Sequence, residues 1–189
     1  VRVDATPPDL TVSGVDGQWH RAPVLALFSA QDATSGITGV GSKLDGAAGW
    51  TPGWAALVSA DGDHTLVVRA VDAAGNETST TVHVKVDTVG PVTSGLAVSA
   101  RAGKKASFKV LVTDALSAGA TTQATIVIKS TAGKTLKTLP AATVTIGTQA
   151  TVSWARCSLK AGTYQYVVYA SDAAGNAQSK AGGGRLVVK

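Results

Sequence analysis

The sequence has 189 residues, a formal net charge of +5 and 44% hydrophobic residues, with 21 glycines and no methionine. No apolar run approaches the ~20 residues that a membrane-spanning helix requires, and the single cysteine, Cys157, excludes an intramolecular disulfide. The chain begins at Val1 without the pattern of a signal peptide, so we expect a fragment or a processed product.

A seven-residue motif occurs twice, at residues 70–76 and 170–176, and reads Ala-x-Asp-Ala-Ala-Gly-Asn in both copies. Each copy follows a run in which apolar residues alternate with polar ones. Asp, Gly and Asn are the residues that tight turns prefer. A repeat at this spacing predicts two domains of about equal size, residues 1–88 and 89–189.

Short alternating segments predict an all-β fold for both domains. In the first domain we expect strands over 10–13, 24–30, 37–44, 64–71 and 80–86, with a turn at 32–36 and a short strand near 55–59. In the second domain we expect strands over 106–112, 124–129, 135–139, 164–170 and 186–189, and one or two more within 142–154. The motif then joins the last two strands of each domain.

Tyr164 follows a Gly-Thr pair at the start of the penultimate predicted strand. This is the position of the tyrosine corner of Ig-like folds, where the hydroxyl group bonds to upstream backbone. The corresponding residue one hundred positions earlier is His64.

The opening residues 1–8 read like residues 84–91, where the first domain ends and the second begins. Residues 1–3 are therefore predicted to be the tail of a last strand from an upstream repeat. Proline in the junction restricts its backbone, so we expect neighbouring domains to sit end to end with limited swing.

The charges of the two halves are opposite. Residues 1–88 carry five basic and ten acidic residues, whereas residues 89–189 carry twelve of the 17 basic residues against only Asp114 and Asp172. The basic half could attract an anionic cell-wall polymer, through lysines that include Lys104, Lys105, Lys109, Lys129, Lys134, Lys137 and Lys160. Solvated lysines on sheet faces and edges explain the pattern equally well. Nucleic acid is not favoured, because no groove-reading helix and no RNA-type aromatic platform is predicted.

Several motifs indicate a known family. Domain one resembles a bacterial Ig-like repeat of surface proteins through Trp19, the Asp32–Gly36 turn, Leu44-Asp45-Gly46 before Trp50, and the segments 62–66 and 72–76. Domain two is similar to the Ig-like module of flagellar hook-capping proteins and secreted bacterial hydrolases, through the segments 126–129, 133–136 and 162–164 and through Trp154. The resemblance implies two tandem Ig-like antiparallel β-sandwiches used for spacing, display or adhesion outside the cytoplasm, without catalysis.

Two candidate metal sites are considered from the residue types. Strand alternation places His64 and His83 on opposite faces, and His20 has no ligand partner at a suitable spacing, so a histidine metal site is not predicted. Oxygen ligands for calcium could come from Asp4, Asp32, Asp72, Asn76 and Asp87. Turn capping by Asp and Asn accounts for the same residues without a metal and is the favoured interpretation.

For three further residues, a structural role is weighed against a role in binding or chemistry. Trp50 and Trp54 could stack on sugar rings, but core or rim packing is the simpler interpretation. Cys157 has no histidine or other base nearby in sequence and is expected to be a buried small hydrophobe.

The sequence therefore predicts no catalytic, cofactor-binding or metal-binding residues, and no cofactor. We expect a noncatalytic extracellular Ig-like spacer or adhesion stalk within a larger secreted or cell-surface bacterial protein, monomeric within a multidomain chain. The alternative is an accessory module that binds glycan or anionic cell-wall polymer and is attached to a secreted hydrolase. No membrane span and no nucleic-acid partner are predicted.

Overall fold

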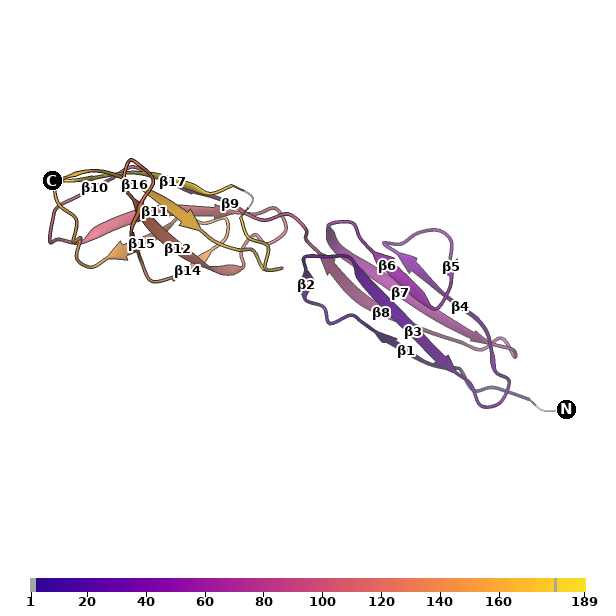
Figure 1. Cartoon of the computed structure of the whole chain (residues 1–189). Coiled ribbons are helices and arrows are strands. Elements are labelled where there is room, and N and C mark those ends of the chain that lie inside the picture. The colour runs from indigo at the N-terminus through magenta and orange to yellow at the C-terminus, as the bar shows by residue number, and fades with distance from the viewer. Residues whose placement is uncertain (1–2, 179) are drawn as a thin grey trace. The chain divides into compact units, whose positions relative to one another are not determined.

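The computed structural model describes residues 3–178 and 180–189, and its contacts divide the chain into two compact units, Val1–Thr88 and Val89–Lys189. We call these units domain one and domain two. The described residues form strands and turns and contain no helix (Figure 1). Residues 1 and 2 of the predicted upstream strand tail lie outside the described residues, and Val3 is not part of a strand.

Domain one is a sandwich of two sheets. One sheet has the order β2-β8-β7-β4-β5 and the other has the order β1-β3-β6. The strands are β1 (Asp9–Ser13), β2 (Trp19–His20), β3 (Val24–Gln31), β4 (Ile37–Leu44), β5 (Thr51–Pro52), β6 (Ala55–Val58), β7 (Gly62–Asp72) and β8 (Glu77–Val86).

The core of domain one follows from the alternation of its strands. In β7, Leu66, Val68 and Ala70 are buried while the residues between them are partly exposed. The facing sheet contributes the inward row Val24, Ala26 and Phe28 of β3 and Val58 of β6. Because successive side chains of a strand point to opposite faces, each alternating run supplies one half of the core.

Domain two is also a sandwich of two sheets. One sheet has the order β10-β17-β16-β12-β13, with β14 paired to β12, and the other has the order β15-β11-β9. The strands are β9 (Val92–Gly95), β10 (Val98–Ala100), β11 (Ala106–Thr113), β12 (Thr121–Lys129), β13 (Thr135–Thr138), β14 (Ala142–Thr145), β15 (Ala150–Trp154), β16 (Gly162–Tyr169) and β17 (Gly182–Val188).

The core of domain two is larger and contains aromatic rings. Phe108 packs edge-on against Tyr166 with 5.0 Å between ring centroids, an arrangement that aromatic pairs prefer. Ile126, Ile128 and Leu186 are fully buried around this pair. The alternating runs predicted over 106–112 and 124–129 therefore supply the centre of the core.

A corner is built in the same way in both domains. Tyr164 donates its hydroxyl hydrogen to the Lys160 carbonyl over 3.0 Å, which confirms the predicted tyrosine corner. His64 occupies the matching position in domain one, and its Nε2 lies 2.9 Å from the Ala60 carbonyl oxygen. In each case the side chain reaches back four residues, across the glycine at position 62 or 162.

Both domains contain a short parallel strand pairing that was not predicted from the sequence. β2 pairs in parallel with the end of β8, and β10 pairs in parallel with the end of β17. Neither β9 nor β10 was predicted, because residues 92–100 lack regular alternation and are interrupted by Gly95. β9 pairs with β11, but Val92 of β9 also bridges Lys180, and β10 pairs with β17, in both cases about ninety residues away. Tertiary contacts therefore help to set the conformation of this segment.

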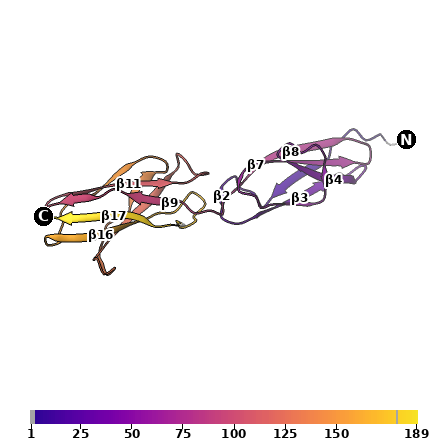
Figure 2. The same cartoon turned by 90° about the horizontal axis from the view of Figure 1, so that it is seen from above.

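Glycines allow β9 to cross closely over β17 in domain two. A Cβ atom at Gly182 would collide with the Thr93 carbonyl group, and one at Gly184 would press on Leu96 and the Tyr166 ring. The Thr93 hydroxyl accepts a hydrogen bond from the Gly182 amide at 2.8 Å and donates to the Val168 carbonyl at 2.9 Å. The glycine run 182–184 is therefore required by packing. Figure 2 shows β17 beside β16.

In each domain the chain arrives at one end of the sandwich and leaves at the other. In domain one, residues 4–8 contact Asn76 and Thr78 at the start of β8, and the chain leaves after Val86. In domain two, Val92 bridges Lys180 ahead of β17, and the chain leaves after Val188. Ten residues of extended strand in β8 span about 33 Å.

Candidate functional site

The repeated motif forms the same hydrogen-bonded turn in both domains. The Oδ1 atom of Asp72 accepts the amides of Ala74 and Asn76 at 2.9 and 2.8 Å, and its Oδ2 atom accepts the Asn76 side-chain amide at 2.8 Å. Asp172 accepts the backbone and side-chain amides of Asn176 at 2.8 and 2.7 Å. Gly75 and Gly175 have φ values of 89° and 85°, a region that favours glycine. The motif is a self-capped turn.

An acidic cluster lies beside this turn in domain one. Carboxylate oxygens of Asp4, Asp32 and Asp72 lie within 4.8 Å of one another. Asp32 caps its own turn by accepting the amides of Thr34 and Ser35 at 3.0 and 2.7 Å. The Oδ2 atom of Asp4 is buried and has no hydrogen-bond partner. These oxygens are of the type that calcium prefers, and Asp4, Asp32 and Asp72 are the residues that could hold it.

Hydrogen bonds keep two members of the cluster ionised. The Ser35 amide is the largest cause that holds the pKa of Asp32 below its ordinary value. Burial opposes ionisation of Asp72, but the hydrogen bonds from Asn76 and the turn amides outweigh it, so the pKa of Asp72 is also lowered. The two carboxylates therefore repel each other in addition to serving as turn caps.

The three histidines are each paired with a different aspartate. His64 Nδ1 lies 2.7 Å from Asp45 Oδ2, His20 contacts Asp16 at 2.8 Å, and His83 contacts Asp63 at 3.1 Å. The Asp45 carboxylate is the largest cause that raises the pKa of His64. None of these pairs shares a residue with another, so the three histidines form no common centre. The pairs of His20 and His64 join a strand to a loop or turn, and the pair of His83 joins β8 to β7.

The two tryptophans proposed as sugar platforms have different surroundings. Lys43 Nζ and the Arg69 guanidinium lie 4.8 and 4.2 Å from the centre of the Trp50 ring. Such cation–π contacts fix the ring on the outer face of β4 and β7. Trp54 is 53% exposed, and it is the one of the pair with open surface for a ligand.

The outer face of β3 and β6 in domain one is apolar. Leu25 and Leu27 of β3 are about half exposed, and Leu57, which is 63% exposed, stands opposite Leu25. Trp54 precedes β6 directly. This patch was not predicted from the sequence, although Leu25 and Leu27 form a second apolar row within Val24–Phe28.

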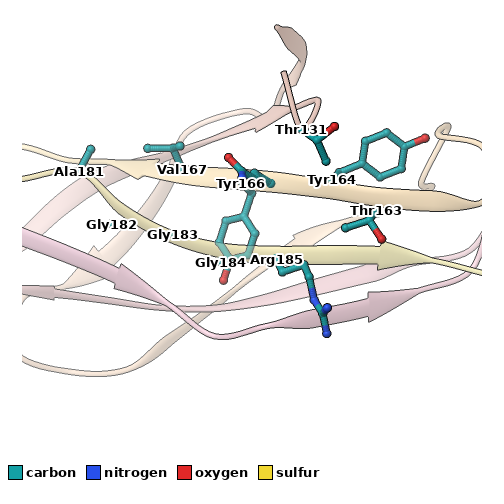
Figure 3. A pocket seen from close by; sticks show the side chains of 11 residues that line it. Thr131, Thr163, Tyr164, Tyr166, Val167, Ala181, Gly182, Gly183, Gly184 and Arg185 are labelled. Atoms are coloured by element: carbon teal, nitrogen blue, oxygen red, sulfur yellow. The ribbon is translucent and has the colours of Figure 1, made fainter. Parts of the chain in front are cut away.

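A groove of about 360 Å³ lies along β16 and β17 in domain two. Figure 3 shows that no side chain rises from β17 between Ala181 and Arg185, because three glycines occupy these positions. The groove is bordered by Thr131, Thr163, Gln165 and Arg185. Exposed backbone flanked by side chains that donate and accept hydrogen bonds can receive a polar ligand.

A second hollow of about 350 Å³ lies at the end of domain two where β10 and β17 finish. Its lining includes four cationic residues, Arg101, Lys104, Lys105 and Lys189. The five ion pairs of the described residues all lie in domain one, and none involves a lysine or arginine of domain two. Of the lysines named from the sequence, Lys104 and Lys105 gather here, whereas Lys129, Lys134 and Lys137 belong to the β12–β13 hairpin.

Cys157 supports this basic end from within. Its side chain is fully buried in the core of domain two. Its backbone carbonyl accepts the Gly103 amide at 2.7 Å, and its amide donates to the Lys104 carbonyl at 2.8 Å. The residue therefore anchors the turn that carries Lys104 and Lys105.

Residues 3–88 match the family of bacterial Ig-like domains. Domain one is a bacterial Ig-like domain. The Ig-like match covers almost all of its described residues, including the turn motif and the acidic cluster. The family resemblance predicted for this domain is confirmed.

Solved structures show the fold of the whole chain. Domains A168–A170 of titin superpose with a TM-score of 0.63 at 12% identity, over 97% of this chain and 67% of that chain. Three N-terminal domains of the Hoc protein of bacteriophage RB49 give a TM-score of 0.54 at 8% identity, over 96% and 70%. Two tandem Ig-like antiparallel β-sandwiches, the predicted fold class, are thereby confirmed.

The chain spans only part of some structures that it matches. It covers 21% of dimeric latent PorU from Porphyromonas gingivalis, with 98% of this chain aligned, 16% identity and a TM-score of 0.39. No curated protein matches the sequence. No helix among the described residues is long and apolar enough to cross a membrane.

Proposed function

We propose that this chain is a noncatalytic spacer, or stalk, within a larger secreted or cell-surface bacterial protein. The observation that carries the proposal is the path of the chain, which arrives at one end of each sandwich and leaves at the other. Each domain thereby adds its full strand length to the reach of whatever is attached. A domain whose ends met at one pole would add little.

The strand pairings suit a load-bearing element. β7 and β8 pair over ten residues, and β16 and β17 pair over seven. The strand that leaves each domain, β8 or β17, is paired along its whole length with its neighbour. Force applied along the chain therefore loads many inter-strand hydrogen bonds at once.

The family and the side chains support an extracellular, noncatalytic role. Domain one belongs to a bacterial Ig-like family, and the histidines of the described residues are each engaged with a separate aspartate. Cys157 is buried and has no access to a substrate. These features fit a structural module placed outside the cell.

Display on a bacterial surface tests the spacer role. An epitope is fused to the chain and exposed on cells, and binding of a bulky antibody is measured. We expect deletion of residues 89–189 to reduce antibody binding, and an unrelated β-sandwich of equal length to restore it. If the replacement fails to restore binding while being folded and displayed equally, the residues themselves rather than their length are required, and the spacer proposal is wrong.

A further inference from the structure

We propose that the outer face of β17 in domain two is a binding track for a linear anionic carbohydrate polymer. The track begins at the groove floored by Gly183 and ends at the basic hollow around Lys189. It depends on the extracellular placement proposed above but not on the spacer role.

The two hollows lie on one continuous surface. Arg185, Val187 and Lys189 alternate with the core residues Leu186 and Val188, so they point away from the core together. Ser99 of β10 stands beside Val187 and lines the basic hollow. From Gly183 to Lys189 the strand extends about 20 Å, which is enough for several sugar units.

The first part of the track suits hydroxyl groups. Gln165 stands beside Arg185 on the neighbouring strand, and Val167 stands beside Gly183. Gly183 lies in the floor of the groove, where a Cβ atom would collide with the Tyr166 carbonyl group of the neighbouring strand. Gln165 and Thr163 border the groove. These are the few convergent polar groups on a partly apolar floor that ligand sites commonly have.

The second part of the track suits anionic groups. The backbone beneath the lysines is fixed, because the Lys189 amide donates to the Ala100 carbonyl at 2.9 Å and the Ala102 amide donates to the Lys189 carbonyl at 3.0 Å. The bonds to Cys157 hold Gly103 and Lys104 from the other side. Lysine side chains are flexible, so each ammonium group can move to contact a negative charge of the polymer while the backbone stays fixed.

The charge of the track is not neutralised within domain two. The two acidic side chains of domain two, Asp114 and Asp172, follow the last residues of β11 and β16. The basic hollow lies near the opposite ends of these strands, where Lys105 precedes β11 and Gly162 begins β16. The eight residues of β11 separate Asp114 from the basic hollow by about 25 Å. This distance exceeds the Debye length of ~8 Å at physiological ionic strength. Asp114 therefore has little effect on the electrostatic potential at the basic hollow.

A carbohydrate polymer fits this surface better than nucleic acid does. Single-stranded nucleic acids bind where bases can stack on open aromatic rings. Tyr166 is buried, and the Tyr164 hydroxyl is engaged with the Lys160 carbonyl. No other aromatic residue lines either hollow. Hydrogen-bonding side chains, bare backbone and point charges match a chain of hydroxyl and anionic groups.

Binding of purified polygalacturonate, a linear polymer of anionic sugar units, to the full chain tests the proposal. The test variant is Lys104→Gln with Lys105→Gln. The charge-matched control is Lys109→Gln with Lys137→Gln, two exposed lysines that line neither hollow. At about 0.1 M salt we expect the test variant to lose about tenfold in affinity and to show a shallower salt dependence, because two charge contacts are removed. The control should stay within about twofold of the unchanged chain.

A third variant, Arg185→Gln, examines the junction of the two hollows and should lose several-fold in affinity. Equal losses in test and control variants, or no binding by the unchanged chain, would overturn the proposal. Tighter binding of double-stranded DNA than of the polymer at equal charge concentration would also overturn it. Melting curves of each variant establish that a loss of binding is not a loss of folding. Failure of the antibody experiment above leaves this measurement unaffected.

Discussion

The two domains share a fold and a capped turn, but they differ in the sign of their net charge and in their ion pairs. Domain one is acidic, and its five ion pairs fasten neighbouring strands and turns. Domain two carries twelve basic residues, none of whose described side chains is in an ion pair. Both domains nevertheless share the alternating strands and the capped turn, so these features and not the surface charge specify the fold. Surface charge can then change sign without disturbing the sandwich.

The cores differ as well as the surfaces. Domain two buries a cluster that includes Phe108, Tyr166 and three isoleucines, whereas domain one relies mainly on valines, together with Leu66 and Phe28. Domain one compensates with side chains outside its core, among them Trp50 beneath two cations and His64 at the corner. The variants below separate these two ways of stabilising one fold.

The largest effect is expected from Phe108→Ala in the core of domain two. Removing a fully buried ring that packs on Tyr166 should cost about 3–5 kcal/mol of unfolding free energy. Calorimetry of the full chain should show the transition of domain two at a lower temperature. A matching shift in the transition of domain one would contradict the independence of the two cores.

A smaller effect is expected from removing the asparagine of either turn. Asn76→Ala and Asn176→Ala each delete a side-chain donor to the motif aspartate. We expect each variant to lose about 1–2 kcal/mol, in the domain that carries it. Urea unfolding of each variant, followed by domain-specific tryptophan signals, provides the measurement. A loss confined to Asn76→Ala would mean that its extra contacts with residues 4–6, and not the shared turn, provide the stability.

The pH dependence of domain one should come in part from His64. Its pKa is raised in the folded state, chiefly by the hydrogen bond to Asp45. Its contribution is therefore complete below the ordinary histidine pKa of about 6.5 and declines as pH rises through the higher folded-state value. We expect the melting temperature of domain one to fall as the pH rises above about 6.5, and His64→Gln to flatten this slope. Domain two has no histidine and serves as the internal control.

The smallest effect is expected from Asp4→Asn in the acidic cluster. In the presence of a chelator this change should slightly raise the melting temperature of domain one, because it removes one of three neighbouring carboxylates. Calcium should have little effect on either protein if the carboxylates serve only as turn caps. A calcium-dependent rise in stability that the Asp4→Asn variant lacks would show instead that the cluster binds the ion.

Particular residues show how far the sequence leads. The strand predicted over residues 37–44 coincides with β4, and Tyr164 makes the predicted corner bond. Both depend on alternation or on neighbours four residues away. The acidic cluster was anticipated only as residue types, because Asp4 and Asp72 meet through chain packing. The groove along β17 was not anticipated, since a glycine run in a sequence does not reveal which backbone will cross it.

The sequence by itself determined the all-β class, the repeated turn and the division of charge between the halves. These properties follow from local rules: side chains alternate along a strand, glycine permits positive φ, and charges are counted residue by residue. Only the tertiary structure decided that Trp50 lies beneath two cations, that the lysines divide between a hairpin and a basic end, and that β17 presents a continuous outer track. Each of these depends on which distant strands become neighbours, and strand pairing is chosen by burial of the whole core.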